Sequence, residues 1–327
     1  MTEYAAAFDW ARRAVEADRL PTAVLGIATA EGVVALDAFG ATGGRAAKVD
    51  DHYRLFSITK PLVGLVAARA IERGLLVPGT PLAAAVPDFG KHRDDLVRLR
   101  HLASHTSGIT EPAMDAPGLR DRLVNGGRDF VAGTMSRYST IAFEGIAALT
   151  EYATGRTWDA DLAEWASALG ADGLTLDEAS DPHVVTDAAA NGLDIEAFAA
   201  LRHPGAGLIG RAGDLLALAS ALLRIGRGET GGVVHPRTLE MMLRPLTGDI
   251  PRLDPYPAAV GQDWGFTWNL RTRAPSLIDR DAYGHGGWAG TELWIHPTAG
   301  VAWVLLTNRV DRPVNIDELD NAVITAL

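Results

Sequence analysis

The chain has 327 residues, which is long enough for one large domain or two ordinary ones. Its hydrophobic content of 47% and charged content of 22% are ordinary for a globular protein. A net charge of −11 without a run of like charges argues against nucleic acid or an anionic membrane as the partner, and the lack of cysteine excludes disulfides, thiolate catalysis and cysteine-ligated metals.

Residues 1–21 mix acidic and basic side chains at helical spacing and lack the apolar segment of a signal peptide. No later stretch approaches the ~18 apolar residues of a membrane helix. We therefore expect a cytoplasmic protein that acts on a small molecule, with neither a membrane nor nucleic acid as its partner.

Strand signals open the chain. Apolar, partly β-branched runs at 24–30 and 33–39 are separated by Glu31-Gly32, and this pattern predicts a hairpin. Apolar residues at 3.6-residue spacing then predict a buried helix over 59–73, which Gly74 ends.

The middle of the chain has helical periodicity, Pro/Gly-rich loops and little strand signal. We expect helices in five segments there and just after it: 96–103, 141–152, 158–169, 214–225 and 235–243. Strand character returns near the end, at 264–270, 291–295 and 301–307. Residues 315–327 predict an amphipathic terminal helix.

Strands near both ends of the chain, around a helical middle, predict an α/β protein of the α+β type. In this interpretation residues 1–75 and 206–327 form a discontinuous α/β domain, and residues 76–205 form an inserted all-helical domain. We expect the active site between the two.

Lysine is rare in this chain, since Lys48, Lys60 and Lys91 are the lysines among 30 basic residues. Lys60 follows Ser57 by three residues at the start of a predicted helix, where residues i and i+3 share a face. A buried amine can lose its charge and take the proton of a serine hydroxyl, whereas a guanidinium stays protonated. The spacing therefore predicts Ser57 as nucleophile and Lys60 as base, although a serine at this position is also common as a helix N-cap.

Two later segments belong with this pair. Tyr138-Ser139-Thr140 lies just before a predicted helix, and His285-Gly286-Gly287 ends a short strand, where glycines let a substrate lie against the backbone. In order and spacing, these segments and Ser57-x-x-Lys60 resemble the three motifs of the serine β-lactamase-like superfamily. The resemblance covers residues 20–327 and is to the branch of class C β-lactamases, family VIII esterases and penicillin-binding-protein-like D-peptidases.

The resemblance implies a β-lactamase/transpeptidase-like fold, with an antiparallel sheet built from the N- and C-terminal segments, flanking helices and an inserted helical domain. It implies that Ser57 is acylated and that Lys60 and Tyr138 move its proton. The oxyanion hole would be the backbone N–H groups of Ser57 and Trp288. The implied substrate-binding residues are Thr140, His285, Gly286, Gly287 and Trp288. The acyl-enzyme would need neither a metal nor an organic cofactor.

Two residues depart from the motifs. Thr140 stands where the family usually has asparagine, and its hydroxyl has one donor in place of an amide's acceptor and two donors. This favours esters over β-lactams and peptides. His285 stands where β-lactamases have lysine and is mostly neutral near pH 7, but histidine is usual among the esterase and D-peptidase relatives.

These residues predict an esterase-like serine hydrolase that cleaves a small ester or lactone through a Ser57 acyl-enzyme. The same motifs fit an acyltransferase of a biosynthetic pathway, in which an alcohol or amine replaces water. A β-lactamase or D-peptidase is a further alternative. A non-catalytic binding protein that keeps the fold as a sensor is an alternative from another class.

Two histidines and four tryptophans are predicted to have structural roles. His101 and His105 have a spacing that can bind zinc, but no glutamate follows His101 as in metalloproteases, and we expect structural roles. Tryptophans predicted to lie mostly in the core or on a sheet face are 264, 268, 294 and 303. Trp288 differs from these because it borders the predicted pocket.

Overall fold

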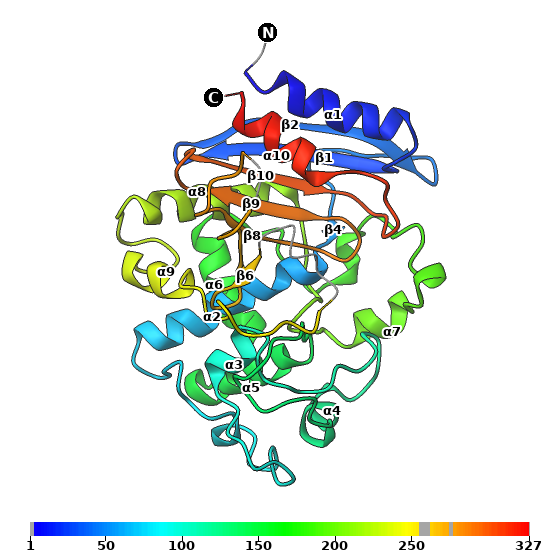
Figure 1. The fold of residues 1–327 in the computed structure, drawn as a ribbon. Helices are drawn as coiled ribbons and strands as arrows, with labels where there is room; N and C mark the ends of the chain where they lie inside the picture. Colours follow the sequence, from blue (N-terminus) through cyan, green and yellow to red (C-terminus); the bar gives the residue numbers. More distant parts are fainter. Residues whose placement is uncertain (1–2, 255–261, 275–276, 327) are drawn as a thin grey trace.

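The computed structural model describes residues 3–254, 262–274 and 277–326, and an antiparallel sheet organises this part of the chain (Figure 1). Its strand order is β3-β2-β1-β10-β9-β8-β7-β6. The strands are β1 (Thr22–Thr29), β2 (Gly32–Thr42), β3 (Arg45–Ala46), β6 (Asp263–Trp264), β7 (Asn269–Leu270), β8 (Tyr283–Gly286), β9 (Glu292–His296) and β10 (Val301–Leu306). A separate short pair consists of β4 (Tyr53–Arg54) and β5 (Ile209–Gly210).

The described residues form ten α-helices, of which some pack on the sheet and others lie away from it (Figure 1). They are α1 (Ala5–Glu16), α2 (Thr59–Glu72), α3 (Leu99–Ala103), α4 (Leu119–Asn125), α5 (Ala142–Thr154), α6 (Trp158–Ala168), α7 (Ile195–Ala200), α8 (Ala212–Gly226), α9 (Pro236–Met242) and α10 (Ile316–Ile324). None of the helices in the described ranges combines the length and apolar character that a membrane crossing requires.

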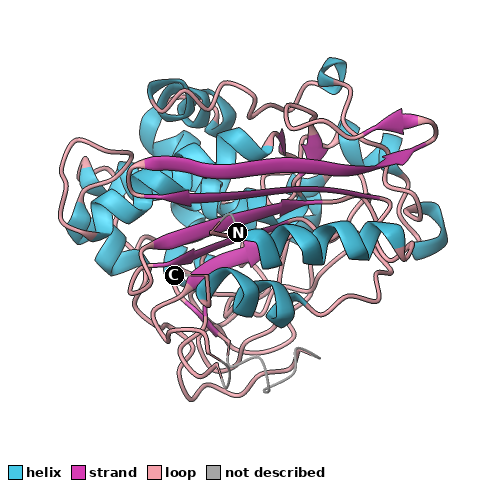
Figure 2. Cartoon of the chain, turned by 90° about the horizontal axis from the view of Figure 1, so that it is seen from above, coloured by secondary structure: helices cyan, strands magenta, loops and turns pink. Residues whose placement is uncertain are grey.

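The centre of the sheet joins the two ends of the chain. β1 and β10 pair antiparallel with Val24 opposite Leu306, and both strands are almost entirely buried. On one face α1 and α10 lie side by side, where Trp10 and Leu319 pack against strand residues such as Trp303 (Figures 1 and 2). The predicted union of N- and C-terminal segments in one antiparallel sheet is therefore confirmed.

Helix α2 lies on the other side of the sheet, between the strands and the helices formed by the middle of the chain (Figure 1). Its residues from Thr59 to Ala68 are all buried, and it packs against both α5 and α6. It approaches the β6–β7 turn so closely that a Cβ on Gly64 would lie 1.8 Å from Thr267 Oγ1. Only glycine fits at this contact.

Two sequence predictions are wrong in detail. The strand predicted over 264–270 is two short strands, β6 and β7, joined by a turn in which Thr267 has φ 69°. The helix predicted over 96–103 begins only at Leu99, because the preceding residues pair with an extended segment, with Leu82 N–H donating to the Val97 carbonyl. The hairpin at 22–42 and the helices α2, α5, α6, α8, α9 and α10 are confirmed. The domain division at residues 75 and 205 stays a prediction.

Candidate active site

Ser57 lies in a sharp turn between β4 and α2, within a 3-10 helix at Phe56–Ile58. Leu55 N–H donates to the Leu208 carbonyl (2.8 Å), so the turn continues from the β4–β5 pair. Phe56 has φ 45°, a left-handed conformation that is unfavourable for a residue with a side chain. Its ring is held between Phe198 and Trp288, with centroid separations of 5.4 and 5.3 Å. Packing of Phe56 therefore supports the strained backbone that presents Ser57.

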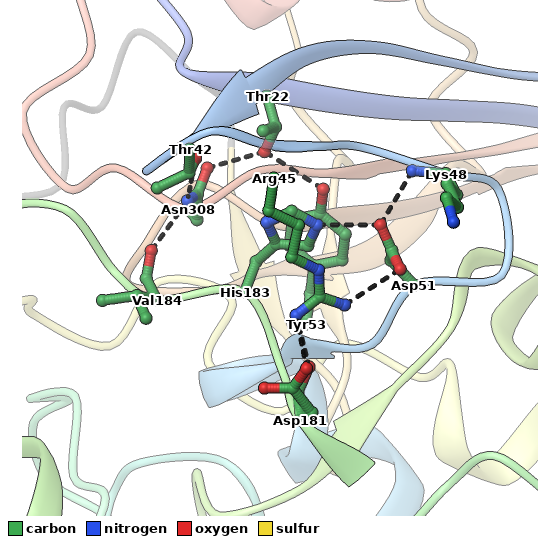
Figure 3. A network of polar contacts seen from close by, with 10 residues as sticks. All are labelled: Thr22, Thr42, Arg45, Lys48, Asp51, Tyr53, Asp181, His183, Val184 and Asn308. Atoms are coloured by element: carbon green, nitrogen blue, oxygen red, sulfur yellow. Dashed lines mark hydrogen bonds and ion pairs between the residues drawn. The ribbon is translucent and has the colours of Figure 1, made fainter.

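A polar network fastens β4 to the sheet (Figure 3). The hydroxyl of Tyr53 donates to Thr22 Oγ1 (3.0 Å), which in turn donates to Asn308 Oδ1 (2.6 Å). The ring of Tyr53 stacks on His183 at 4.7 Å, and His183 Nε2 lies 2.8 Å from the Asp51 carboxylate. Because Tyr53 precedes Ser57 by four residues, this network fixes the start of the nucleophile turn.

The Lys60 amine is wholly buried behind Ser57. Its Nζ lies 3.0 Å from Ser57 Oγ, 3.3 Å from Thr140 Oγ1 and 2.8 Å from the Gly205 carbonyl oxygen. Burial lowers the pKa of Lys60 from 10.5 to about 7, and the Glu111 carboxylate opposes this shift. A large share of Lys60 is therefore neutral near pH 7 and able to accept a proton from Ser57.

Tyr138 presents its ring to the same amine. Lys60 Nζ lies 4.7 Å from the ring centroid, and the ring stacks on His105 at 4.4 Å. The backbone N–H of Tyr138 donates to Asp254 Oδ1 (2.7 Å). His105 also accepts the N–H of Ser139 through Nδ1 (3.0 Å), so it fixes both the ring and the backbone of this segment.

The third motif ends strand β8. His285 is buried, and burial lowers its pKa to about 3, so its imidazole is neutral. Its Nδ1–H donates to the Gly286 carbonyl at 2.7 Å. Gly287, the last residue of the motif, lies close to the turn that carries Ser57. A Cβ on Gly287 would be 2.5 Å from the Leu55 carbonyl oxygen. Thr291 Oγ1 donates to that same carbonyl (3.1 Å), which joins the β8–β9 turn to the turn of Ser57.

A cavity of about 580 Å³ opens onto Ser57. The predicted site residues that line it are Ser57, Tyr138, Thr140, His285, Gly286, Gly287 and Trp288, while Lys60 lies behind Ser57. Trp264 and Trp294 also line the cavity, so for these two the interpretation as mostly core or sheet-face residues is incomplete; Trp268 and Trp303 are fully buried core residues. The structure thus brings all residues of the three motifs to one place.

Sequence reasoning missed three contributors to the site. Glu111 lines the cavity and accepts the backbone N–H of Thr140 (2.8 Å). The Gly205 carbonyl contacts the Lys60 amine, and the N–H of Gly205 donates to His203 Nδ1 (2.9 Å). His203 and Gly205 belong to a His-Pro-Gly segment, and Glu111 precedes a proline. Both patterns are common in surface loops, so neither predicts a functional residue by itself.

Comparison with known proteins shows which sequences and folds this chain resembles. Esterase EstB from Burkholderia gladioli is 31% identical over 138 residues, which is 35% of this chain and 35% of that relative. The match thus spans only about a third of that esterase.

Solved structures share the fold over nearly the whole chain. EstCE1, described as a hydrolase with promiscuous acyltransferase activity, covers 98% of both chains at 21% identity with a TM-score of 0.79. A penicillin-binding protein homologue from Caulobacter crescentus covers 100% of this chain and 98% of its own at 20% identity, with a TM-score of 0.80. The predicted β-lactamase/transpeptidase-like fold is confirmed. The Beta-lactamase family model matches residues 8–326, and the chain belongs to that family.

Proposed function

We propose that the protein is an esterase-like serine hydrolase that cleaves a small ester or lactone through an acyl-enzyme on Ser57. The observation that carries this proposal is the contact of 3.0 Å between Ser57 Oγ and a wholly buried lysine amine at the wall of a cavity. A lysine buried for structural reasons alone would be costly, and a lowered pKa matches the task of a general base.

The proposed reaction has two halves. Ser57 Oγ attacks the carbonyl carbon of the substrate while its proton passes to the Lys60–Tyr138 pair, and the N–H groups of Ser57 and Trp288 hold the oxyanion. The carbon–oxygen bond to the leaving alcohol breaks, and that alcohol takes up the proton. Water then attacks the acyl carbon by the same route, which releases the acid and restores Ser57.

Two features of the cavity favour esters. Thr140 contacts Lys60 through a hydroxyl at 3.3 Å. This hydroxyl offers a substrate amide fewer hydrogen-bonding groups than the side chain of an asparagine would. His285 is neutral, so the third motif supplies no fixed cation for a carboxylate there. We further propose a cytoplasmic enzyme with a small-molecule acyl substrate and with neither a membrane nor nucleic acid as partner.

Acyl transfer is the second candidate. Apolar side chains of Pro112, Met114 and Trp288 line the cavity beside Ser57 and would hold the carbon chain of an acceptor alcohol. Structural relatives include EstCE1 and simvastatin synthase (LovD) from Aspergillus terreus, the latter with a TM-score of 0.77 at 20% identity over 100% of this chain and 98% of its own. Chromatography of the products formed with an added alcohol separates the two candidates: a new ester supports transfer, and free acid alone supports hydrolysis.

A fluorophosphonate probe tests the common acyl-enzyme step. We expect covalent labelling of Ser57 and hydrolysis of 4-nitrophenyl acetate by the intact protein, both abolished by Ser57→Ala. Ser180→Ala is the matched control, because Ser180 lies in a short 3-10 helix at Glu178–Ser180 and does not line the cavity. An intact protein that neither labels at Ser57 nor hydrolyses such an ester would overturn the proposal.

A further inference from the structure

Glu111 supplies a helix cap from a distant loop. Helix α5 begins at Ala142, and its N-cap residue, Ile141, has no side chain that can accept the free N–H groups of the first turn. The Glu111 carboxylate accepts the N–H of Thr140 at 2.8 Å and that of Ile141 at 3.2 Å. A negative charge at a helix N-terminus is favourable, so Glu111 both caps α5 and fixes the segment before it.

That segment is the one that faces Lys60. Thr140 is held by Glu111 through its backbone and contacts Lys60 Nζ through its side chain, so it connects the two charged groups. Its neighbours are held in the same manner, with the N–H of Ser139 donated to His105 and that of Tyr138 donated to Asp254. Glu111 differs from these other acceptors because its carboxylate also lines the cavity at Ser57.

We propose that Glu111 is a positioning residue of the acylation site: its carboxylate holds the backbone of residues 140 and 141 so that Tyr138 and Thr140 face the Lys60 amine, and its negative charge balances that amine. The inference rests on the proposed acylation of Ser57. It assigns to a loop glutamate the task of ordering the second motif and of setting the proton affinity of the base.

The electrostatic surroundings of Lys60 are consistent with this role. The groups that face the amine from the packed elements are Glu111, Tyr138, His105, His203 and His285. Burial lowers the pKa of each of the three imidazoles, so they are neutral. Burial raises the pKa of Glu111 and the Lys60 charge opposes that shift, while Glu111 in turn raises the pKa of Lys60. Removing the carboxylate charge therefore lowers the pKa of Lys60.

The test compares Glu111→Gln, Glu111→Ala and the control Glu144→Gln by the second-order rate of fluorophosphonate labelling across pH. Glu144 is a matched control, because it lies in the first turn of α5 and burial also raises its pKa, yet it pairs with Arg120 and does not line the cavity. Glu111→Gln keeps an acceptor oxygen. We expect the acidic limb of its pH–rate profile, where labelling slows as Lys60 becomes protonated, to lie at lower pH than in wild type. We expect its maximal labelling rate to be about three- to tenfold below wild type. Glu111→Ala also loses the cap, and we expect a loss of about 100-fold.

Each outcome of this experiment supports or overturns the role of Glu111. Wild-type rates and an unshifted limb in both Glu111 variants would overturn the inference while leaving the proposed function intact. An equal shift in Glu144→Gln would overturn it too, because the effect would then belong to any buried charge on α5. If Glu111→Ala does not fold, the position of the acidic limb in the pH–rate profile of Glu111→Gln tests the inference by itself. If the wild-type protein is not labelled at all, the proposed function fails, and the inference fails with it.

Discussion

Replacing Lys60 with arginine keeps a positive charge behind Ser57 but removes the neutral form of the base. In the wild-type protein Lys60 Nζ is wholly buried, and its pKa falls from 10.5 to about 7. The neutral form of Lys60 is then well populated near pH 7, whereas in water only about one lysine in three thousand would be neutral. The proposed acylation depends on that difference.

The direction of the pH dependence follows from the lowered pKa. Labelling of Ser57 needs the neutral amine, so the wild-type rate falls below about pH 7 and reaches a plateau above it. Stability changes in the same direction. Between about pH 7 and 10.5 the unfolded lysine binds a proton that the folded one has lost, so the free energy of unfolding rises with pH by roughly 1.4 kcal/mol per unit from this group.

We expect Lys60→Arg to label about 10²- to 10⁴-fold more slowly than wild type at every pH between about 6 and about 9, because that is the usual contribution of a general base. The assay is the rate of fluorophosphonate inactivation, with urea unfolding to verify that the variant is folded. Lys60→Met, which has a similar unbranched stem and no amine, is the companion variant and should lose the same activity. A rate for Lys60→Arg within about tenfold of wild type, or a limb that stays near pH 7, would refute the assignment of Lys60 as base.

Three further substitutions test the structure around the site. Thr140→Val removes one hydroxyl contact to the amine, and we expect labelling to slow about fivefold with unchanged thermal stability; an unchanged rate would exclude a role for the hydroxyl. Gly287→Ala places a Cβ 2.0 Å from a side-chain oxygen, so thermal unfolding should show a loss of about 1–3 kcal/mol, whereas Gly213→Ala, with open space around its Cβ, should not. Asp320→Ala removes the buried carboxylate that accepts the indole N–H of Trp303 at 2.6 Å, so urea unfolding should show a loss of about 1–3 kcal/mol, with labelling of the folded fraction retained.

The elements that the sequence predicts well are those whose burial pattern repeats along the chain. Helix α8 buries most of its apolar residues at helical spacing, and the hairpin of β1 and β2 consists of two apolar runs on either side of Glu31-Gly32, so local sequence identifies both. The errors arise where a distant segment sets the backbone. The turn at Thr267 packs against α2 at Gly64, and no periodicity within 264–270 records that contact.

The same distinction applies to the site. Ser57, Lys60 and Tyr138 are recognisable because each belongs to a short motif of fixed spacing. Glu111 acts on residues 29 and 30 positions away, and the Gly205 carbonyl reaches an amine 145 positions away. Such contacts depend on how the loops pack on α2 and α5, so the residues that support the motif side chains emerge only from the folded chain.

Burial lowers the pKa of Lys60, and two imidazoles beside its amine are neutral acceptors of backbone hydrogen bonds. Burial holds the pKa of His203 at about 3 and that of His105 well below 6.5, so neither carries a charge beside Lys60. Each instead accepts a backbone N–H, His105 from Ser139 and His203 from Gly205. These hydrogen bonds fix the two backbone segments that contact the amine. A protonated imidazole would donate where an acceptor is needed and would release both segments, so the order of the site depends on the same desolvation that lowers the pKa of the lysine.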